Sequence, residues 1–232
     1  PLNVLRPVTV KVPPTATLSF ATVSGGASDL NGLSDCKTFG TNSLMIGDAT
    51  TGTIDAADNN TGVGVDIFAA LTTGDRNTTM GTGSMAALTT GANNVGYGAY
   101  NLASITASNG NTAIGYQTQQ NGDGGEYNVS VGYRAGRELT SGDYNIAIGA
   151  YALDANTTAN NNTAVGYNSL TANTTAINNA AFGSRTLESN TTGALNAALG
   201  TYALLANTTG ANNTAVGVSS LEANTTGANN IA

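Results

Sequence analysis

Glycine recurs every 17 residues through most of this chain, and no other feature limits its fold so strongly. The glycines stand at positions 47, 64, 81, 98, 115, 132, 149, 166, 183, 200 and 217, with no insertion between them. An asparagine stands four residues earlier in each unit from Asn60 to Asn230, after Ser43 in the first unit, and an apolar residue directly precedes each glycine. A fixed period of this length indicates stacked copies of one structural unit. It divides the 232 residues into an arm, residues 1–42, and a repeat array, residues 43–232.

The composition of the unit predicts strands and turns and disfavours helices. Glycine, asparagine and threonine recur so often that they would weaken a helix, and no 3.6-residue apolar stripe runs through the unit. Segments before the glycine, such as NIAIG and NTAVG, are rich in β-branched residues and predict a short strand. The glycine and the ANTTG segment predict the turns that close one coil. We therefore predict an all-β fold, a parallel β-solenoid or β-roll of 17-residue coils whose strands lie about 4.8 Å apart.

The asparagine column allows two interpretations. Identical amides placed one above another can hydrogen-bond along the stack, as they do in cross-β assemblies. Alternatively, each asparagine caps a local turn in its own coil. Both roles are structural.

The strand avoids charge on both of its faces. In TAVG, Thr163 and Val165 belong to one face, and Ala164 and Gly166 belong to the other. A strand that carries no charge on either face is usually covered on both. A single thin coil also holds few large aliphatic side chains to bury. We therefore expect one face to pack inside its own coil and the other to pack against a neighbouring chain.

Charge and residue content exclude several classes of function. The net charge is −7 and the seven basic residues are scattered, so the chain has no basic patch for nucleic acid or an anionic membrane. No apolar run of about 18 residues predicts a membrane span. The chain has no histidine, one cysteine, Cys36, and dispersed acids. Because no nucleophile–base pair, metal cluster or cofactor site can be named, we expect a protein that is not an enzyme and has no cofactor.

The repeat resembles two groups of fibrous proteins. Strands such as NTAIG, NIAIG and NTAVG, followed by segments with Ala and Leu, are similar to the YadA-like head repeats of trimeric autotransporter adhesins. The longer form NTAVGYNSLTANTT resembles arrays in bacteriophage tail fibres and related virion appendages, and the 17-residue period favours this second group. The resemblance covers residues 43–232. It implies a left-handed parallel β-roll in a homotrimer, used for adhesion or host recognition.

The arm falls outside the 17-residue register. VTVKV and TATLSF predict two short strands, separated by Pro13 and Pro14, which exclude a helix and restrict strand pairing to sheet edges. Because the end of a solenoid exposes unpaired strand edges, the arm can be a cap. It can also dock the fibre on a baseplate or tail protein of a virion, or donate a strand to a neighbouring subunit. The chain opens on Pro1 and stops two residues before the next repeat glycine would fall, so we expect a segment of a longer protein.

Two coils deviate from the repeat without changing its length. GDATTGTIDAADNN, residues 47–60, has Asp55 in the turn column, and the coil of residues 115–128 deviates more. In GYQTQQNGDGGEYN, residues 115–128, Gln119 replaces the usual leucine and Asp123 replaces the turn threonine. Gln119, Asp123, Glu126 and Tyr127 are our candidate receptor contacts, because recognition draws on exposed aromatic and charged groups. Alternatively, this coil is a loop with unusual surface residues that contact no receptor. Asp123 and Glu126 lack a repeated Asp-x-Asp spacing, which favours solvated turn acids over a calcium site.

These observations lead to one expected function and two alternatives. We expect a passive shaft of a virion tail fibre or similar appendage, which supports attachment to a host-surface receptor of unknown identity. The first alternative is a bacterial cell-surface adhesin or extracellular filament subunit. The second is ice binding, because the paired threonines of NTT stack into columns. Adjacent threonines point to opposite sides of a strand, however, so a flat Thr-x-Thr face is not evident.

Overall fold

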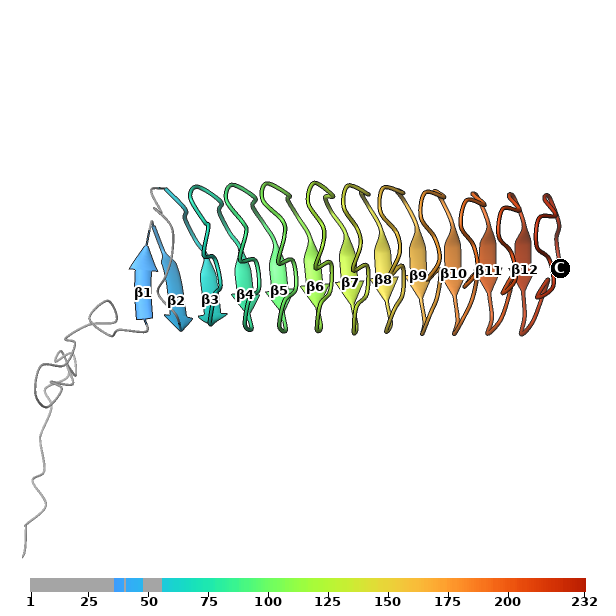
Figure 1. Cartoon of the computed structure of the whole chain (residues 1–232), viewed down its shortest axis with the longest axis horizontal. Coiled ribbons are helices and arrows are strands. Elements are labelled where there is room, and N and C mark those ends of the chain that lie inside the picture. Colours follow the sequence, from blue (N-terminus) through green and yellow to red (C-terminus); the bar gives the residue numbers. More distant parts are fainter. Residues whose placement is uncertain (1–35, 40, 48–55) are drawn as a thin grey trace, which may run out of the picture.

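The chain folds into one parallel solenoid (Figure 1), seen in a computed structural model that describes residues 36–39, 41–47 and 56–232. Every regular element in these residues is a strand, and they contain no helix that could cross a membrane. The strands are β1 (Cys36–Phe39), β2 (Ser43–Gly47), β3 (Thr61–Gly64), β4 (Thr78–Met80), β5 (Val95–Tyr97), β6 (Thr112–Ile114), β7 (Val129–Val131), β8 (Ile146–Ile148), β9 (Thr163–Val165), β10 (Ala180–Phe182), β11 (Ala197–Leu199) and β12 (Thr214–Val216). The all-β prediction is confirmed.

All twelve strands form one sheet in the order of the sequence. Strands β2 to β12 are parallel, and each residue pairs with the residue 17 positions later, as Ala164 pairs with Ala181. Each coil therefore rises by one strand spacing, and the sheet extends over about 50 Å. The eleven parallel strands confirm the predicted β-solenoid and its 17-residue register.

Strand β1 runs antiparallel to β2 and covers the edge of the first parallel strand. Cys36 pairs with Ile46, and Phe39 pairs with Ser43. Such pairing satisfies the backbone groups that an end coil would otherwise expose. The predicted strands VTVKV and TATLSF lie outside the described residues, so docking and strand donation by the arm stay predictions.

The repeat glycine turns the chain at the end of each strand. From Gly47 to Gly217, the φ angle of this column lies between +122° and +148°, a range that side chains rarely adopt. A Cβ added to Gly166 would also overlap the carbonyl group of Gly183 in the next coil. The backbone angle and the close stacking of coils each require glycine, which explains the period seen in the sequence.

Three other columns adopt left-handed backbone conformations with residues other than glycine. In one coil these are Asn168, Leu170 and Asn178, with φ angles of +53°, +50° and +59°. Left-handed backbone costs an L-residue roughly 1 kcal/mol or more, and a leucine adopts it only when its surroundings compensate. Leu170 is fully buried. Burial of this leucine column in the core therefore holds the coil in its tight turn.

The asparagine column forms a continuous hydrogen-bonded ladder. In each of the ten steps from Asn60 to Asn230, the backbone N–H donates to the Oδ1 of the asparagine one coil earlier, at 2.8 to 3.0 Å. The side chains also fix turns, because Asn162 Nδ2 donates to the carbonyl of Ala176 at 2.9 Å. The ladder interpretation is confirmed. The same side-chain amides also hydrogen-bond to a turn of their own coil.

A second asparagine ladder runs through the C-terminal coils. It consists of Asn156, Asn173, Asn190, Asn207 and Asn224. The Nδ2 group of each of the last four donates to the Oδ1 of the asparagine one coil earlier, at 2.9 to 3.3 Å. Each Nδ2 also donates to the carbonyl three residues later, as Asn173 does to Ala176 at 3.0 Å. These are the asparagines of the NTT motif. We expected turn residues there, and the ladder is an additional role that the sequence analysis missed.

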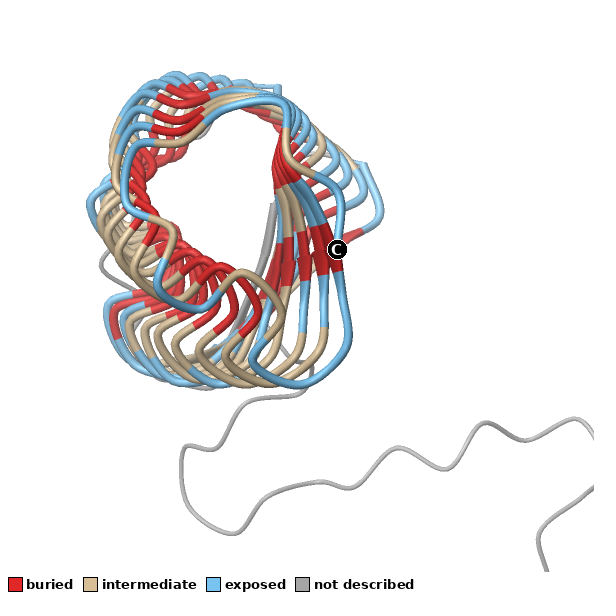
Figure 2. Cartoon of the chain, turned by 90° about the vertical axis from the view of Figure 1, so that its right-hand side faces the viewer, coloured by how far each residue is buried: buried red, intermediate tan, exposed pale blue. Residues whose placement is uncertain are grey.

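The interior contains two apolar clusters that are separated by a polar coil. Figure 2 looks along the solenoid and shows buried residues in continuous stripes from coil to coil. The first cluster ends at Ala113, and the second begins at Ala135. Between them Gln119 replaces the core leucine, and its Nε2 donates to Ser130 Oγ at 2.7 Å. The irregular coil therefore interrupts the apolar core.

Candidate functional site

The outer side of the parallel sheet forms an apolar surface without a charged residue. In β9, Ala164 is buried, and its neighbours Thr163 and Val165 lie on the outer side. We call this surface the strand face, and it has two columns. The first column is Leu44, Thr61, Thr78, Val95, Thr112, Val129, Ile146, Thr163, Ala180, Ala197 and Thr214; the second is Ile46, Val63, Met80, Tyr97, Ile114, Val131, Ile148, Val165, Phe182, Leu199 and Val216.

The strand face leaves large apolar side chains in solvent. Tyr97, Phe182 and Leu199 are 51%, 41% and 54% exposed. The backbone of the interior strands is hydrogen-bonded within the sheet, so this surface offers a partner mainly apolar contact. Contiguous exposed apolar surface marks an interaction site in a folded protein. The strand face is therefore the principal candidate functional surface.

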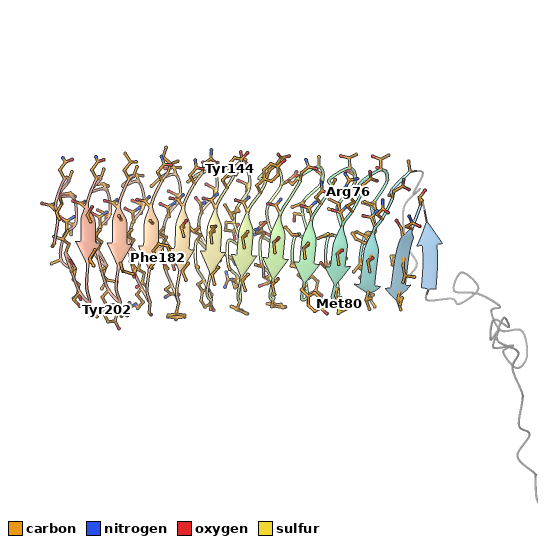
Figure 3. All side chains as sticks on the ribbon, turned by 180° about the vertical axis from the view of Figure 1, so that it is seen from behind. Arg76, Met80, Tyr144, Phe182 and Tyr202 are labelled. Atoms are coloured by element: carbon orange, nitrogen blue, oxygen red, sulfur yellow. The ribbon has the colours of Figure 1, made fainter. Side chains whose placement is uncertain are left out.

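The C-terminal part of the strand face is hollowed into a groove. The groove has a volume of about 240 Å³ and is lined by Ala180, Phe182, Ala197, Ala198, Leu199, Thr214 and Val216. On β10 and β11 the small Ala180 and Ala197 of the first column stand beside the large Phe182 and Leu199 of the second, so the first column is the lower one at these two levels. Figure 3 labels Phe182 and Met80, which both belong to the second column.

The irregular coil brings three of its four candidate contacts to the surface. Asp123 and Tyr127 are exposed, and Glu126 is half-buried. Gln119 is only 3% exposed. Its side chain fills the space beside Gly136 of the next coil, where an added Cβ would lie 2.8 Å from Ser130 Oγ. Gln119 is therefore a core residue, which corrects its assignment as a receptor contact.

The two acids of this coil are hydrogen-bonded to the preceding coil. Asp123 Oδ1 accepts from Thr106 Oγ1 at 2.8 Å, and Glu126 Oε1 accepts from Asn109 Nδ2 at 2.7 Å. In the part of the chain that the structure describes, no group of three or more His, Cys, Asp or Glu side chains is placed to hold a metal ion. Asp123 and Glu126 therefore act as turn residues that continue the contacts between coils.

A row of tyrosines follows the corner next to the repeat glycines. The row is formed by Tyr100, Tyr116, Tyr133, Tyr151 and Tyr167, with neighbouring ring centroids 5.3 to 6.3 Å apart. Tyr127 and Tyr144 stack separately at 5.4 Å, and in Figure 3 Tyr144 lies on the edge opposite Tyr202. Aromatic pairs of this kind contribute about 0.5 to 1.5 kcal/mol each. The row spans the coils in which Gln119 interrupts the core, so it joins these coils from outside.

A cluster of charges lies against the tyrosine row. The guanidinium of Arg134 lies 5.5 Å from the ring centre of Tyr151 and pairs with Asp154 at 3.7 Å. Arg137 Nε lies 3.2 Å from Asp154 Oδ1, but neither atom has a hydrogen-bond partner. Burial raises the pKa of the Asp154 carboxyl above its ordinary value, and this effect outweighs the attraction of Arg134. The cluster joins neighbouring coils through the ion pairs of Asp154 with Arg134 and Arg137.

Comparisons with protein-family models, with curated proteins and with solved structures find no match to this chain. The likeness to fibre proteins therefore depends on the repeat residues themselves. The features of this chain that bear on its function are the strand face, the irregular coil and the asparagine ladder that joins successive coils.

Proposed function

We propose that this chain is a shaft segment of a virion tail fibre or similar surface appendage, in which three copies associate. The observation that supports this function best is the strand face, which is apolar, uncharged and continuous along a rod of about 50 Å. A long surface of this composition suits lateral packing of rods. The number of copies and the virion setting come from the resemblance of the NTAVG repeats to tail-fibre arrays.

The hydrogen-bond ladders support a mechanical role. The steps from Asn60 to Asn230 join every pair of neighbouring coils, so the rod has no long flexible connection in the described part of the array. Such a rod can hold a recognition element at a distance from its attachment point. In this proposal the arm contacts baseplate or tail proteins, and a host receptor contacts parts that break the repeat. The shaft needs no cofactor, nucleic acid or membrane insertion.

A bacterial cell-surface adhesin or extracellular filament is the second candidate, because the same rod would serve in either appendage. Ice binding gains no support from the strand face. Threonine occupies its first column in five coils, whereas the second column contains no threonine and includes bulky side chains such as Tyr97 and Phe182. The turn threonines are also engaged, since Thr174 Oγ1 donates to the carbonyl of Thr191 at 3.3 Å.

Immunogold electron microscopy can test the proposed setting. Antibodies raised against the whole chain would be applied to virions and to uninfected cells of the strain whose genome encodes it. We expect label along the tail fibres of virions. Label on the envelope of uninfected cells would support the adhesin instead, and label on neither would contradict both appendage functions.

A further inference from the structure

Two exposed tyrosines, Tyr127 and Tyr144, lie face to face on neighbouring coils. We propose that this pair is a modification site, at which a one-electron oxidant, such as a haem peroxidase acting with hydrogen peroxide, joins the two rings into a dityrosine. The cross-link ties two coils of the rod together covalently. The inference goes beyond the proposed function, because it depends on the geometry of the rod and not on the appendage that carries it.

The two rings are held close and nearly parallel. Their centroids are 5.4 Å apart, and their planes differ by 7°. Both residues occupy the same position in successive coils and have left-handed backbones, with φ angles of +55° and +56°, so their side chains leave the rod in the same direction. Reacting groups that are held side by side couple far faster than groups that must meet by diffusion. Coupling within one chain is therefore favoured over coupling between chains.

The pair is open to an oxidant and forms an isolated pair within its column. Tyr127 and Tyr144 are 52% and 59% exposed, and Figure 3 shows Tyr144 at the outer edge of the rod. On one side the ring of Tyr127 lies over Gly110, where an added Cβ would come within 2.6 Å of Tyr127 Cδ1. On the other side the same position of the next coil is Asn161. A radical formed on either ring therefore has one neighbouring phenol in its column, that of its partner.

The second stacked pair of tyrosines is less suited to coupling. Tyr116 and Tyr133 lie 5.7 Å apart with an interplanar angle of 14°, but they are only 42% and 44% exposed. Each ring also has a further tyrosine against it, Tyr100 beside Tyr116 and Tyr151 beside Tyr133. Coupling requires two rings to turn until their reacting carbons meet. The flanking rings restrict this movement in the tyrosine row, whereas Tyr127 and Tyr144 have solvent beside them.

The reaction balances with hydrogen peroxide as the oxidant. Each phenol gives up one electron and one proton, and the two hydrogen atoms removed in this way reduce one peroxide to two molecules of water. The two phenoxyl radicals then form one carbon–carbon bond between the ring carbons next to their oxygens. The hydrogen on each of these carbons moves to the neighbouring oxygen, which restores both aromatic rings and both hydroxyl groups.

The cross-link lies next to the interruption of the apolar core. Tyr127 belongs to the coil in which Gln119 replaces the core leucine, and Tyr144 belongs to the coil that follows. A covalent tie between residues 17 positions apart restricts the unfolded chain, as a disulfide does. The cross-linked rod should therefore unfold at a higher temperature than the untreated rod.

Oxidation of the whole folded chain by a haem peroxidase and hydrogen peroxide tests the site. Tyr144→Phe keeps the stacked ring and removes one phenol from the proposed pair. Tyr133→Phe is the matched control, because it makes the same change in the second stacked pair. Dityrosine would be measured by its fluorescence and located by mass spectrometry of peptides, and a denaturing gel would separate single chains from joined ones. Circular dichroism would verify that each variant is folded before treatment.

We expect the unmodified chain and Tyr133→Phe to form dityrosine within single chains, with the mass of two hydrogen atoms lost and a higher midpoint of thermal unfolding. Tyr144→Phe, and likewise Tyr127→Phe, should lose most of this yield and show no shift of the midpoint. An undiminished yield in Tyr144→Phe, or an equal loss in Tyr133→Phe, would move the coupling to the tyrosine row and overturn the proposal. Dityrosine formed only between chains, or not at all, would also overturn it. An unchanged midpoint in the cross-linked chain would contradict the stabilising tie.

Discussion

The backbone N–H of Asn179 donates to the Oδ1 of Asn162, which lies 3.0 Å away and one coil earlier. The same Asn162 side chain donates through its Nδ2 to the carbonyl of Ala176 at 2.9 Å. The position therefore needs a donor and an acceptor on one short, buried side chain. Asparagine meets this need, which gives a physical reason for its recurrence in the column.

Replacing this amide by a carboxylate should destabilise the coil. In Asn162→Asp the retained oxygen can still accept from Asn179, but the second oxygen would face the carbonyl of Ala176 and bring a buried charge. We expect a loss of about 3 kcal/mol in the free energy of unfolding. Asn178→Asp is the control, because Asn178 is exposed and should change stability by less than about 0.5 kcal/mol. Equal midpoints of thermal unfolding for the two variants, at one protein concentration, would show that the ladder is dispensable.

The glycine column should be intolerant of any side chain. Gly166→Val combines a positive φ with an overlap against Gly183, and we expect a loss of at least about 3 kcal/mol. Thr175→Val introduces the same residue at an exposed turn position, where we expect a change within about 0.5 kcal/mol. Thermal unfolding of both variants provides the comparison. The explanation of the 17-residue period would be wrong if Gly166→Val were as stable as Thr175→Val.

The interrupted core should be the least stable part of the array. Gln119→Leu alone leaves the buried Ser130 hydroxyl without its partner, so we expect no gain in stability. Adding Ser130→Ala restores the residue types of the regular coils and should stabilise the double variant by about 1 kcal/mol relative to Gln119→Leu. Amide hydrogen exchange should be fastest near residues 115–136 in the unmodified chain and slower in the double variant. Uniform exchange along the array would argue against a weak coil.

Receptor contact is the remaining prediction for the irregular coil. Asp123→Thr, Glu126→Ala and Tyr127→Asn together convert its surface to that of the regular coils while leaving the buried Gln119 in place. If this chain contributes to host adhesion, we expect the triple variant to lose most of its binding to host cells. Binding at full strength by the triple variant would place adhesion on the regular shaft or on the arm.

The features that depend on strict repetition could be predicted from the sequence. The period, the parallel strands and the ladder through Asn162 all follow from placing identical residues at one spacing. The charge-free strand in TAVG also predicted two covered faces, and the inner face is buried in the coil. The period, the parallel strands, the ladder and the buried inner face hold because a side chain stacked on its own copy leaves few geometric choices, whereas cover of the outer face by a neighbouring chain stays a prediction.

Features that depend on the path of each turn could not be predicted. Leucine has no intrinsic preference for positive φ, so the sequence gives no sign that Leu170 adopts it. The tyrosine row joins residues 16 to 18 positions apart, such as Tyr133 and Tyr151, which a search at a fixed period of 17 does not align. Gln119 looked like a surface residue because glutamine is usually exposed, and only the space beside Gly136 shows why it is buried.

Sedimentation equilibrium of the whole chain tests the central claim most directly, because it measures mass independently of shape. The shaft function and its strand-face contact predict a mass of three copies of the 23.0-kDa chain, about 69 kDa, that persists on dilution to micromolar concentration. A mass of 23.0 kDa throughout that range would mean that the strand face stays open to solvent, and it would contradict the claim.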